Sequence, residues 1–507
     1  MPADPGHQAL EVSFTDDPRV VREAATEDYS THVVPRSWRS GRWSLAMAWG
    51  ALFSAMFWLY IAVASADAVG TPATIVGMAL SMVTYGVVNF VLSRYAARTG
   101  LTVALLSRRL FGVLGSALAP LLFAATAVYY GVFEGSIIAV ALQRYFGGEI
   151  RLWYLAVVLY ALPLVIGGVR VWLDKLNGVL LPLYVAGLLA AVVTATVERG
   201  YPHDWLGSAP AGGGALPGWL TSYLIYMGVW IMMMYTVDYA RFGRAADQGF
   251  HSTVTFGWVF YLCTFAVNGL IGIYLLRAWH IAGSETGVVD AFLRTLGFAG
   301  VVVIIVSQTR INTANYYLAS TNLEAFAARV LRVRLPRVAW VAVAGVVAYL
   351  LMLTDVLGYL LRALAWQGVF VTAWVAIALV HIAVRGADRD GLPEFRPLRL
   401  APVTAGAGAW AVASAIGITL TEQTAHATLA QLAPLITVAL AAGLYWLALR
   451  FGPDPVRARG GDPRDEVEDI WETRVRCRAC DRSYIAVEMD RTATDDVVCS
   501  ACAADSR

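Results

Sequence analysis

Long apolar stretches alternate with short polar connections along the sequence. A helix needs about 20 apolar residues to cross the roughly 30 Å hydrocarbon core of a bilayer. Twelve stretches approach that length. The pattern therefore predicts an all-α polytopic membrane protein with twelve transmembrane helices, at residues 43–68, 71–94, 114–143, 152–169, 177–196, 216–238, 254–277, 296–321, 337–354, 357–384, 400–420 and 429–451.

Composition agrees with this pattern. Of the 507 residues, 58% are hydrophobic and only 15% are charged, and the mean hydropathy is +0.60. Soluble domains carry about 25% charged residues, so an ordinary soluble protein is excluded. The membrane part shows no Gly-rich phosphate loop, nucleophile and base pair or metal site, and we expect neither an enzyme nor a nucleic-acid partner.

Basic residues are concentrated in alternate connections between the apolar stretches. The positive-inside rule places such connections in the cytoplasm, and an even number of helices returns the C-terminus to the same side. We expect a multi-pass plasma-membrane protein whose residues 1–42 are cytoplasmic, mostly flexible and without a signal peptide. The basic connections include Arg94, Arg98, Arg108, Arg109, Arg170, Lys175, Arg241, Arg244, Arg329, Arg332, Arg385 and Arg389.

The segment from Tyr95 to Leu110 is too short and too basic to span a bilayer. Its regularly placed leucines predict an interfacial helix on the inner membrane face. A solvated connector is the alternative.

One apolar stretch contains an unusual polar run, SQTRINTANYYLAS, from Ser307 to Ser320. In a helix, Gln308, Asn312 and Asn315 would share one face, with Arg310 at its border. A polar face inside a bilayer has to point toward protein or water. This run is therefore the first candidate for a functional site.

Two of the predicted helices contain interruptions. Small residues follow Trp49 and Gly50 in the first, and Gly228 interrupts the sixth. Helix breaks at matching positions of two halves are typical of transporters built from inverted repeats, with the substrate site at the bilayer midplane. Glycine is also common in membrane helices, so the breaks need support from other features.

Four sequence motifs resemble the nucleobase:cation symporter family of purine, cytosine and allantoin permeases, with the cytosine permeases most similar. They occur in family order between about Ser40 and Arg450. The motifs are LFSAMFW (Leu52–Trp58), YAARTGLTVALLSRRLFGVLGS (Tyr95–Ser116), DYARFGR (Asp238–Arg244) and NYYLAS (Asn315–Ser320).

The resemblance implies two inverted five-helix repeats plus two peripheral helices, as in amino-acid/sodium symporter-like folds. It also implies a secondary active transporter that imports a nucleobase or related planar heterocycle, such as cytosine, a purine or an allantoin- or hydantoin-like compound. Transport would proceed by alternating access, coupled to Na⁺ or H⁺. The substrate would lie among helices one, three, six and eight.

Within that resemblance, Tyr130 falls where the family has a Trp that stacks on the base, and Ala127 falls where cytosine permeases have a hydrogen-bonding Gln. A phenol ring also offers a π face, but the missing Gln means that substrate identity does not transfer. Trp230 is expected to be the second stacking ring. The remaining candidate substrate-binding residues are Ser54, Glu134, Thr313 and Asn315.

Sodium-coupled relatives bind the cation between helix eight and the carbonyls of broken helix one. The corresponding candidates here are Gln308, Asn312, Leu52 and Phe53. Two departures weigh against sodium: Ile311 replaces a frequent Thr, and Arg310 adds a fixed charge.

Glu134 is a second ionisable residue within an apolar helix. An isolated charge at mid-membrane costs at least about 2.5 to 3.5 kcal/mol, so we expect Glu134 and Arg310 to form an ion pair beside the substrate. Arg310 in place of a cation would give uncoupled transport, and a titrating Glu134 would give proton coupling. A purely structural pair is the alternative.

The C-terminal segment contains a C-x-x-C pair, eighteen residues and a second C-x-x-C pair. This spacing predicts a small zinc ribbon, whereas four free thiols or disulfides are weaker alternatives in the reducing cytoplasm. The expected domains are a transporter at 43–451, a linker at 452–472 and a zinc module at 473–507. The expected Zn²⁺ ligands are Cys477, Cys480, Cys499 and Cys502.

The sequence leaves the role of this module open between regulatory docking of a cytoplasmic protein partner, stability control and self-association. Two other functions also remain open. The same fold serves permeases for amino acids or vitamin precursors, and a base-binding membrane receptor could signal through a zinc module.

Overall fold

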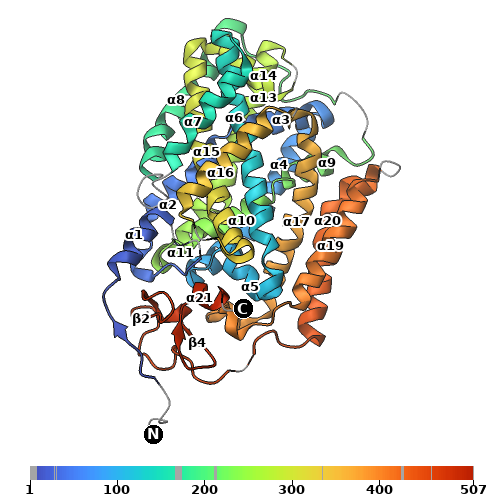
Figure 1. The fold of residues 1–507 in the computed structure, drawn as a ribbon. Helices are drawn as coiled ribbons and strands as arrows, with labels where there is room; N and C mark the ends of the chain where they lie inside the picture. The colour runs from blue at the N-terminus through green and yellow to red at the C-terminus, as the bar shows by residue number, and fades with distance from the viewer. Residues whose placement is uncertain are drawn as a thin grey trace.

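Helices form most of the computed structural model and lie side by side in a bundle, with a small β-containing module at one end (Figure 1). The structure describes residues 8–27, 29, 31–165, 174–210, 214–281, 283–333, 335–354, 356–423, 427–457 and 459–505.

The first predicted helix is broken in its middle. α2 (Arg42–Trp49) passes into a 3₁₀ turn (Gly50–Ser54), and α3 (Phe57–Val69) continues at an angle of 43°. The backbone at Ala55 is extended, with φ −58° and ψ 130°. Helical hydrogen bonding is therefore interrupted there, and the carbonyl groups of the turn become available to other donors.

The sixth predicted helix is broken in the same way. α9 (Gly218–Met227) and α10 (Ile231–Ala240) meet at 41°, on either side of Gly228. Both interruptions predicted from the sequence are therefore present.

The helices after each break follow a similar order. Two short helices, α5 (Val103–Gly115) and α14 (Glu285–Leu296), lie at opposite ends of the bundle (Figure 1), as two inverted halves require. The other helices of the two halves are α4 (Thr71–Thr99), α6 (Leu118–Phe146), α7 (Ile150–Val165), α8 (Asp174–Arg199), α13 (Asn268–Trp279), α15 (Phe298–Phe326), α16 (Arg337–Met352) and α17 (Val356–Val384).

Short turns connect α10 to α13. They are the 3₁₀ turn Ala245–Asp247, α11 (Gln248–Phe250), the π-helical turn His251–Thr255, α12 (Trp258–Tyr261) and the π-helical turn Leu262–Val267.

The last two helices of the bundle lie at its edge. α19 (Ala405–Thr421) packs on α20 (Ala427–Phe451), and both contact α17 (Figure 1). This position agrees with the two peripheral helices that the sequence resemblance implies. The connection from α17 contains α18 (Gly386–Asp390) and a 3₁₀ turn (Pro397–Arg399).

Every one of the twelve predicted ranges contains helix, but helix alone does not define a membrane span. By length and composition, six helices in the described part qualify as spans, or up to eight if each broken pair is one span. Three shorter apolar helices, α7, α16 and α19, add to these. The protein is thus mostly helical with several spans, and the number twelve remains a prediction.

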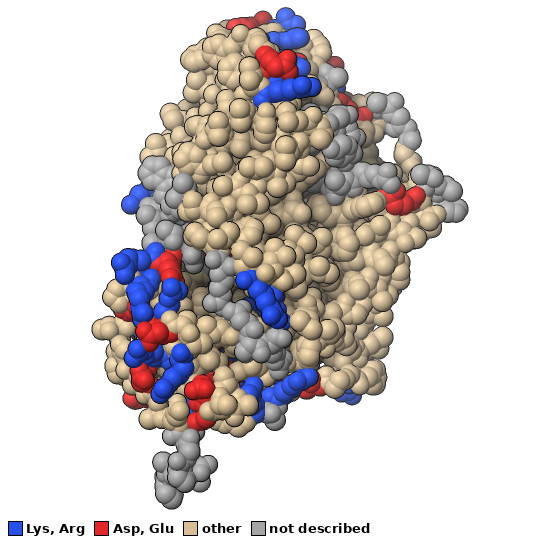
Figure 2. Space-filling model, viewed as in Figure 1, with Lys and Arg blue, Asp and Glu red and all other residues tan. Residues whose placement is uncertain are grey.

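Close helix packing and charge distribution both suit a membrane protein. A Cβ at Gly272 of α13 would lie 2.6 Å from the carbonyl oxygen of Leu59 on α3, so only glycine permits this approach. On the face seen in Figure 2, charged side chains cluster at the ends of the molecule, mainly around the β-containing module, and a broad uncharged band separates them.

The segment after α4 differs from the predicted interfacial helix. Leu101, Leu105, Leu106 and Leu110 are all fully buried within the protein, whereas an interfacial helix would present such residues to lipid. The spacing of leucines along the sequence shows that a helix has an apolar face, but not whether that face contacts lipid or protein. α5 is instead an internal element with a kink at Gly112, where φ is +84°.

The two chain termini form one body at the end of the bundle. β1 (Val12–Ser13) pairs antiparallel with β2, and β2 pairs antiparallel with β3. We call the described residues of 8–40 and 459–505 the terminal cap. Its other elements are α1 (Pro18–Glu27), the 3₁₀ turns Arg36–Trp38 and Ala486–Glu488, β2 (Arg474–Arg476), β3 (Ser483–Ile485), β4 (Asp490–Arg491), β5 (Val497–Val498) and α21 (Ser500–Asp505).

The expectation of a mostly flexible N-terminal segment is therefore wrong for its described residues. Val12 pairs with Val475 across the sheet, and Trp38 donates a hydrogen bond to Asp16 over 2.7 Å. The polar composition of this segment suggested flexibility. Its ordering partner could not be read from the local sequence, because that partner is more than 400 residues away in the chain.

Candidate functional site

The polar run of α15 packs against α6 and the broken first helix. Gln308 connects all three: its Nε2 donates to the carboxylate of Glu134 on α6, and its Oε1 accepts from the backbone N–H of Met56 over 3.1 Å. Glu134 and Gln308 are both buried. The structure thus joins two residues that the sequence placed in separate roles, substrate binding and cation binding.

The carbonyl groups predicted to face a cation accept hydrogen bonds from the protein. The indole of Trp58 donates to the carbonyl of Leu52 over 2.7 Å, and the amide of Asn268 donates to that of Phe53 over 2.6 Å. Asn268 also accepts from the hydroxyl of Tyr184 over 2.9 Å. The sequence interpretation missed Asn268, although an Asn inside an apolar helix was a usable signal.

Arg310 contacts the broken helix rather than Glu134. Its Nη2 donates to the carbonyl oxygen of Gly50 over 2.8 Å. Among the described residues, no salt bridge joins it to Glu134, so the predicted ion pair is wrong for this structure. Residues two positions apart on a helix do not face the same neighbour. Because Gln308 faces Glu134, Arg310 points elsewhere.

The guanidinium of Arg310 therefore brings a positive charge to the break in the first helix. Its Nε and Nη1 atoms are buried and have no hydrogen-bond partner in the described part of the chain. The charge lies at the carbonyl of Gly50, two residues before Leu52, whose carbonyl was a candidate cation ligand.

The two predicted stacking rings are buried in the interior. Tyr130 of α6 is 7% exposed, and Trp230, at the junction of α9 and α10, is 5% exposed. Phe57 of α3 meets Tyr130 edge to face, with ring centroids 6.0 Å apart. No ring contact links Tyr130 to Trp230, both of which the structure describes.

Three polar groups of the candidate site have unused hydrogen-bonding capacity. The Tyr130 hydroxyl, the Trp230 indole N–H and the Asn312 Nδ2 are buried and have no partner among the described residues. Asn312 lies close to α6, since a Cβ at Gly131 would be 3.9 Å from its Oδ1. Buried donors are rarely left unpaired in native proteins, and this makes the three groups candidates for contact with a ligand.

The other candidate residues bond within the protein. The hydroxyl of Ser54 donates to the carbonyl of Ala51 over 2.9 Å, and that of Thr313 donates to the carbonyl of Arg310 over 2.6 Å. Asn315 accepts from the Tyr235 hydroxyl over 3.2 Å and donates to Asn312.

A void of about 10 Å³ borders Asn312 and Thr313, which is room for about one water molecule. At this void the interior is too tightly packed to hold a base.

The four cysteines of the terminal cap converge on one point. Their sulfur atoms all lie within 4.8 Å of one another, and all four are free of disulfides. Zn–S bonds of about 2.3 Å in a tetrahedron separate the sulfurs by about 3.8 Å, so this donor set fits Zn²⁺. The ligand atoms belong to Cys477, Cys480, Cys499 and Cys502.

Two broken helices packed around a pair of unbroken ones define a fold class. Such discontinuous helices, one in each half, characterise secondary transporters with a central site. The bundle described above has this organisation: the 3₁₀ turn of the first broken helix packs on α15, α10 of the second contacts α6, and α6 packs along α15.

Comparison with solved structures agrees with this class. The chain is similar to Mhp1, a nucleobase-cation-symport-1 family transporter, in a closed conformation with bromovinylhydantoin bound: identity is 20%, coverage is 86% of this chain and 98% of that one, and the TM-score is 0.66. The inward-facing conformation of Mhp1 matches at 18% identity, with 86% and 97% coverage and a TM-score of 0.68.

A Na⁺-coupled sialic acid symporter in a substrate-bound outward-open state is also similar, at 12% identity, 86% and 93% coverage and a TM-score of 0.59. No protein-family model and no curated protein sequence matches the chain. The structural similarity confirms the transporter fold predicted from the sequence and agrees with the family resemblance. It does not single out the cytosine permeases.

Proposed function

We propose that this chain is a secondary active transporter of the nucleobase:cation symporter family that imports a nucleobase or related planar heterocycle. The proposal rests on three buried groups with unused hydrogen-bonding capacity, which belong to Tyr130, Trp230 and Asn312. Trp230 borders the second helix break, and Tyr130 packs on Phe57, next to the first. The Mhp1-like fold and the sequence motifs support it.

The free groups indicate the chemistry of the substrate. Two aromatic rings offer flat apolar faces for a planar ring. The Trp230 indole and the Asn312 amide are both donors, so the substrate should present ring carbonyl or ring nitrogen acceptors. Pyrimidines, purines and hydantoins all do so. Amino acids and other aliphatic solutes lack the planar ring and are the second class to test.

Alternating access would move the broken helices relative to α6 and α15. The hydrogen bonds from the Met56 backbone N–H to Gln308 and from Arg310 to the Gly50 carbonyl cross this boundary. They are therefore expected to change when the site opens to either side. Because the Glu134 carboxylate accepts a hydrogen bond from Gln308, its surroundings would change in the same movement.

The coupling ion is Na⁺ or H⁺, and different observations favour each. Similarity to a Na⁺-coupled symporter supports sodium. The Arg310 guanidinium beside Gly50, and the protein hydrogen bonds to the carbonyls of Leu52 and Phe53, favour proton coupling through Glu134.

An uptake experiment tests function and coupling together. Purified protein in liposomes is supplied with radiolabelled cytosine, uracil, hypoxanthine, hydantoin and leucine, with a sodium gradient, a pH gradient or neither. We expect accumulation of at least one heterocycle and none of leucine. Accumulation of leucine alone would overturn the substrate class, and binding without any flux would indicate a receptor.

We also propose that Cys477, Cys480, Cys499 and Cys502 bind Zn²⁺, which would supply structural cross-linking rather than chemistry. A module this small has too little apolar core to fold by itself. Metal analysis of the purified protein should give about one zinc per chain.

We further propose that the protein lies in the plasma membrane with both termini in the cytoplasm. The basic connections between the helices would then lie on the cytoplasmic side as well.

A further inference from the structure

The terminal cap joins the residues before α2 to the cysteine module. His32 stacks on Tyr484 with ring centroids 4.2 Å apart, and its Nδ1 lies 3.0 Å from a carboxylate oxygen of the buried Glu488. Arg474 contacts Asp16 over 2.8 Å. The folded module therefore determines the path of the chain that enters the first broken helix.

The N-terminal part of the cap is also attached to the end of the second broken helix. The Nη1 of Arg241, directly after α10, donates to the carbonyl of Tyr29 over 3.0 Å. The backbone N–H of Ser40 donates to the carbonyl of Phe242 over 2.8 Å. One short segment thus connects the ends of α2 and α10 on the side of the molecule that carries the cap (Figure 1).

The C-terminal part of the cap is attached to helices that lie outside the two breaks. Arg329, after α15, donates to the carbonyl of Ala504, and Arg108 of α5 donates to the hydroxyl of Ser500 over 2.9 Å. Ser500 and Ala504 both belong to α21, which also carries Cys502.

A second set of contacts anchors the segment between α20 and the cysteine module. The buried Arg396 bonds to Asp462 over 2.6 Å and to the carbonyl of Met489 over 2.9 Å. Arg399 bonds to Asp490 over 2.9 Å. The predicted linker is therefore fixed to the connection between α17 and α19.

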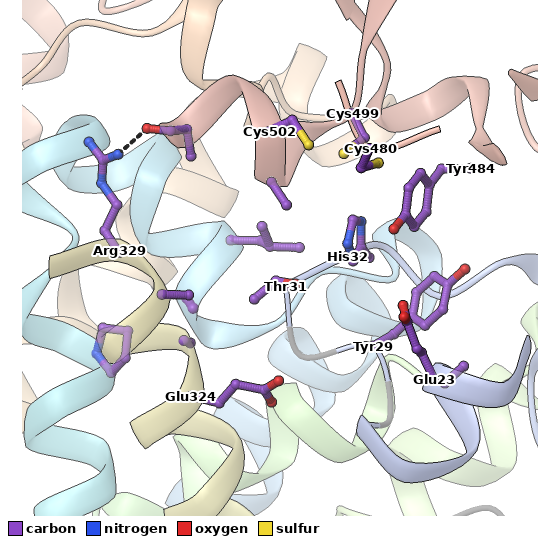
Figure 3. A pocket seen from close by; sticks show the side chains of 18 of the residues that line it. Glu23, Tyr29, Thr31, His32, Glu324, Arg329, Cys480, Tyr484, Cys499 and Cys502 are labelled. Carbon is purple, nitrogen blue, oxygen red and sulfur yellow. Dashed lines mark hydrogen bonds between the residues drawn. The ribbon is translucent and has the colours of Figure 1, made fainter. Parts of the chain in front are cut away.

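A cavity of about 420 Å³ separates the cap from the bundle. Figure 3 shows the sulfur atoms of Cys480, Cys499 and Cys502 on one side and Glu324 of α15 on the other, with Tyr29 and His32 along the edge. The cap thus spans this space and contacts the bundle around it, through polar bonds and through a buried apolar cluster in which Val33 and Ile485 of the cap meet Leu105 of α5. Separation at this surface would also expose that apolar cluster, so we expect it only when the cap loses its own fold.

We propose that the terminal cap is a metal-dependent latch on the cytoplasmic side of the transporter. With metal on its four cysteines, the cap holds the ends of α2 and α10 against α5 and α15 and keeps that side closed. Loss of the metal unfolds the cysteine module and releases both helix ends. This inference rests on the proposed function, because a latch acts only on a protein that alternates between two open sides.

Hydrogen exchange of the full-length protein in lipid nanodiscs tests the latch without measuring transport. Protein loaded with Zn²⁺ is compared with protein treated with EDTA, and exchange is followed in peptides from α2, α10 and α20. We expect removal of the metal to speed exchange in α2 and α10 about 10-fold, with α20 unchanged. Faster exchange confined to the cap would overturn the proposal.

A variant that keeps the cysteines separates the latch from simple unfolding of the module. Arg108→Ala combined with Arg329→Ala removes the two contacts to α21 and should retain zinc, yet speed exchange in α2 and α10. Thr494→Ala is the matched control, since Thr494 is exposed and bonds only within the module. A double variant that exchanges like the control contradicts the latch.

The outcomes also separate the latch from the proposed function. If no heterocycle enters liposomes but metal still controls exchange in α2 and α10, the transport proposal fails and the conformational coupling stands. If transport occurs but the exchange rates of α2 and α10 are the same with and without metal, the latch proposal is rejected and the transport proposal stands.

Discussion

The candidate site between α6 and α15 and the seam between the terminal cap and the bundle are built differently. At the site, Gln308 bonds to Glu134 and Met56, and the neighbouring void holds about 10 Å³. At the seam, arginines reach across the rim of a 420 Å³ cavity. The interior is close-packed and depends on helix packing, whereas the seam combines long polar side chains, a small buried apolar cluster and the fold of a metal module.

Removal of the metal ligands should give the largest difference between the two regions. Cys480→Ser with Cys502→Ser eliminates two of the four thiolates, and structural zinc contributes about 10 to 16 kcal/mol in small zinc modules. We expect loss of zinc and rapid proteolysis after residue 470, while the bundle keeps its thermal midpoint. A bundle that unfolds together with the cap would show that the regions are one cooperative unit.

Substitution of Arg310 tests the interior region. Arg310→Ala leaves the carbonyl of Gly50 without its donor and removes the charge at the break; a charged hydrogen bond contributes about 1.5 to 3 kcal/mol. We expect transport to fall at least about 10-fold, with zinc content unchanged. Arg310→Lys, which keeps the charge, is the control. If Arg310→Ala transports normally, the residue does not take part in the mechanism.

The stacking rings should affect affinity more than stability. Trp230→Ala removes one flat face and one donor, and aromatic contacts of this kind contribute about 0.5 to 1.5 kcal/mol beyond area. We expect the KM for the transported base to rise about 10-fold, and Tyr130→Phe to have a smaller effect because the ring remains. Leu183→Ala, an exposed position on α8, serves as the control. Unchanged KM in the Trp230 variant would exclude stacking there.

Acid should weaken the seam slightly. Burial raises the pKa of Asp462, but hydrogen bonds and charge from Arg396 outweigh burial and lower that pKa to about 2. This contact therefore contributes stability above the pKa of about 3.9 in the unfolded chain, and the contribution is lost as the pH falls toward 2. Asp462→Asn should remove this part of the acid dependence, measured by proteolysis of residues 452–472 between pH 5 and pH 3. Identical pH profiles for both proteins would exclude it.

The sequence predicts the bundle better than the contacts inside it. The helices, both breaks and the peripheral pair follow from apolar length, glycine positions and motifs, because membrane spans are set by length and local hydropathy. The ion pair of Glu134 and Arg310 failed because hydropathy carries no information on how neighbouring helices are rotated. Asn268 itself was a visible signal in an apolar helix, but its partners, Phe53 and Tyr184, lie on other elements and could not be read from the sequence.

The terminal cap shows a different limit. The cysteine spacing identified the four convergent thiols, since two C-x-x-C pairs define a donor set locally. The contacts of Asp16 with Arg474 and of His32 with Glu488 join residues more than 400 positions apart, and no local pattern signals such pairs. The N-terminal segment therefore appeared flexible in sequence and is ordered by its partner in the structure.

Solute counterflow tests directly whether the protein transports a planar heterocycle, because it needs no assumption about the coupling ion. Liposomes containing the protein and preloaded with unlabelled cytosine, hypoxanthine or hydantoin receive the same compound labelled, outside. We expect transient accumulation of label for at least one of these heterocycles, and weaker accumulation at the same concentration in Trp230→Ala. Counterflow for leucine and for none of the heterocycles would contradict it.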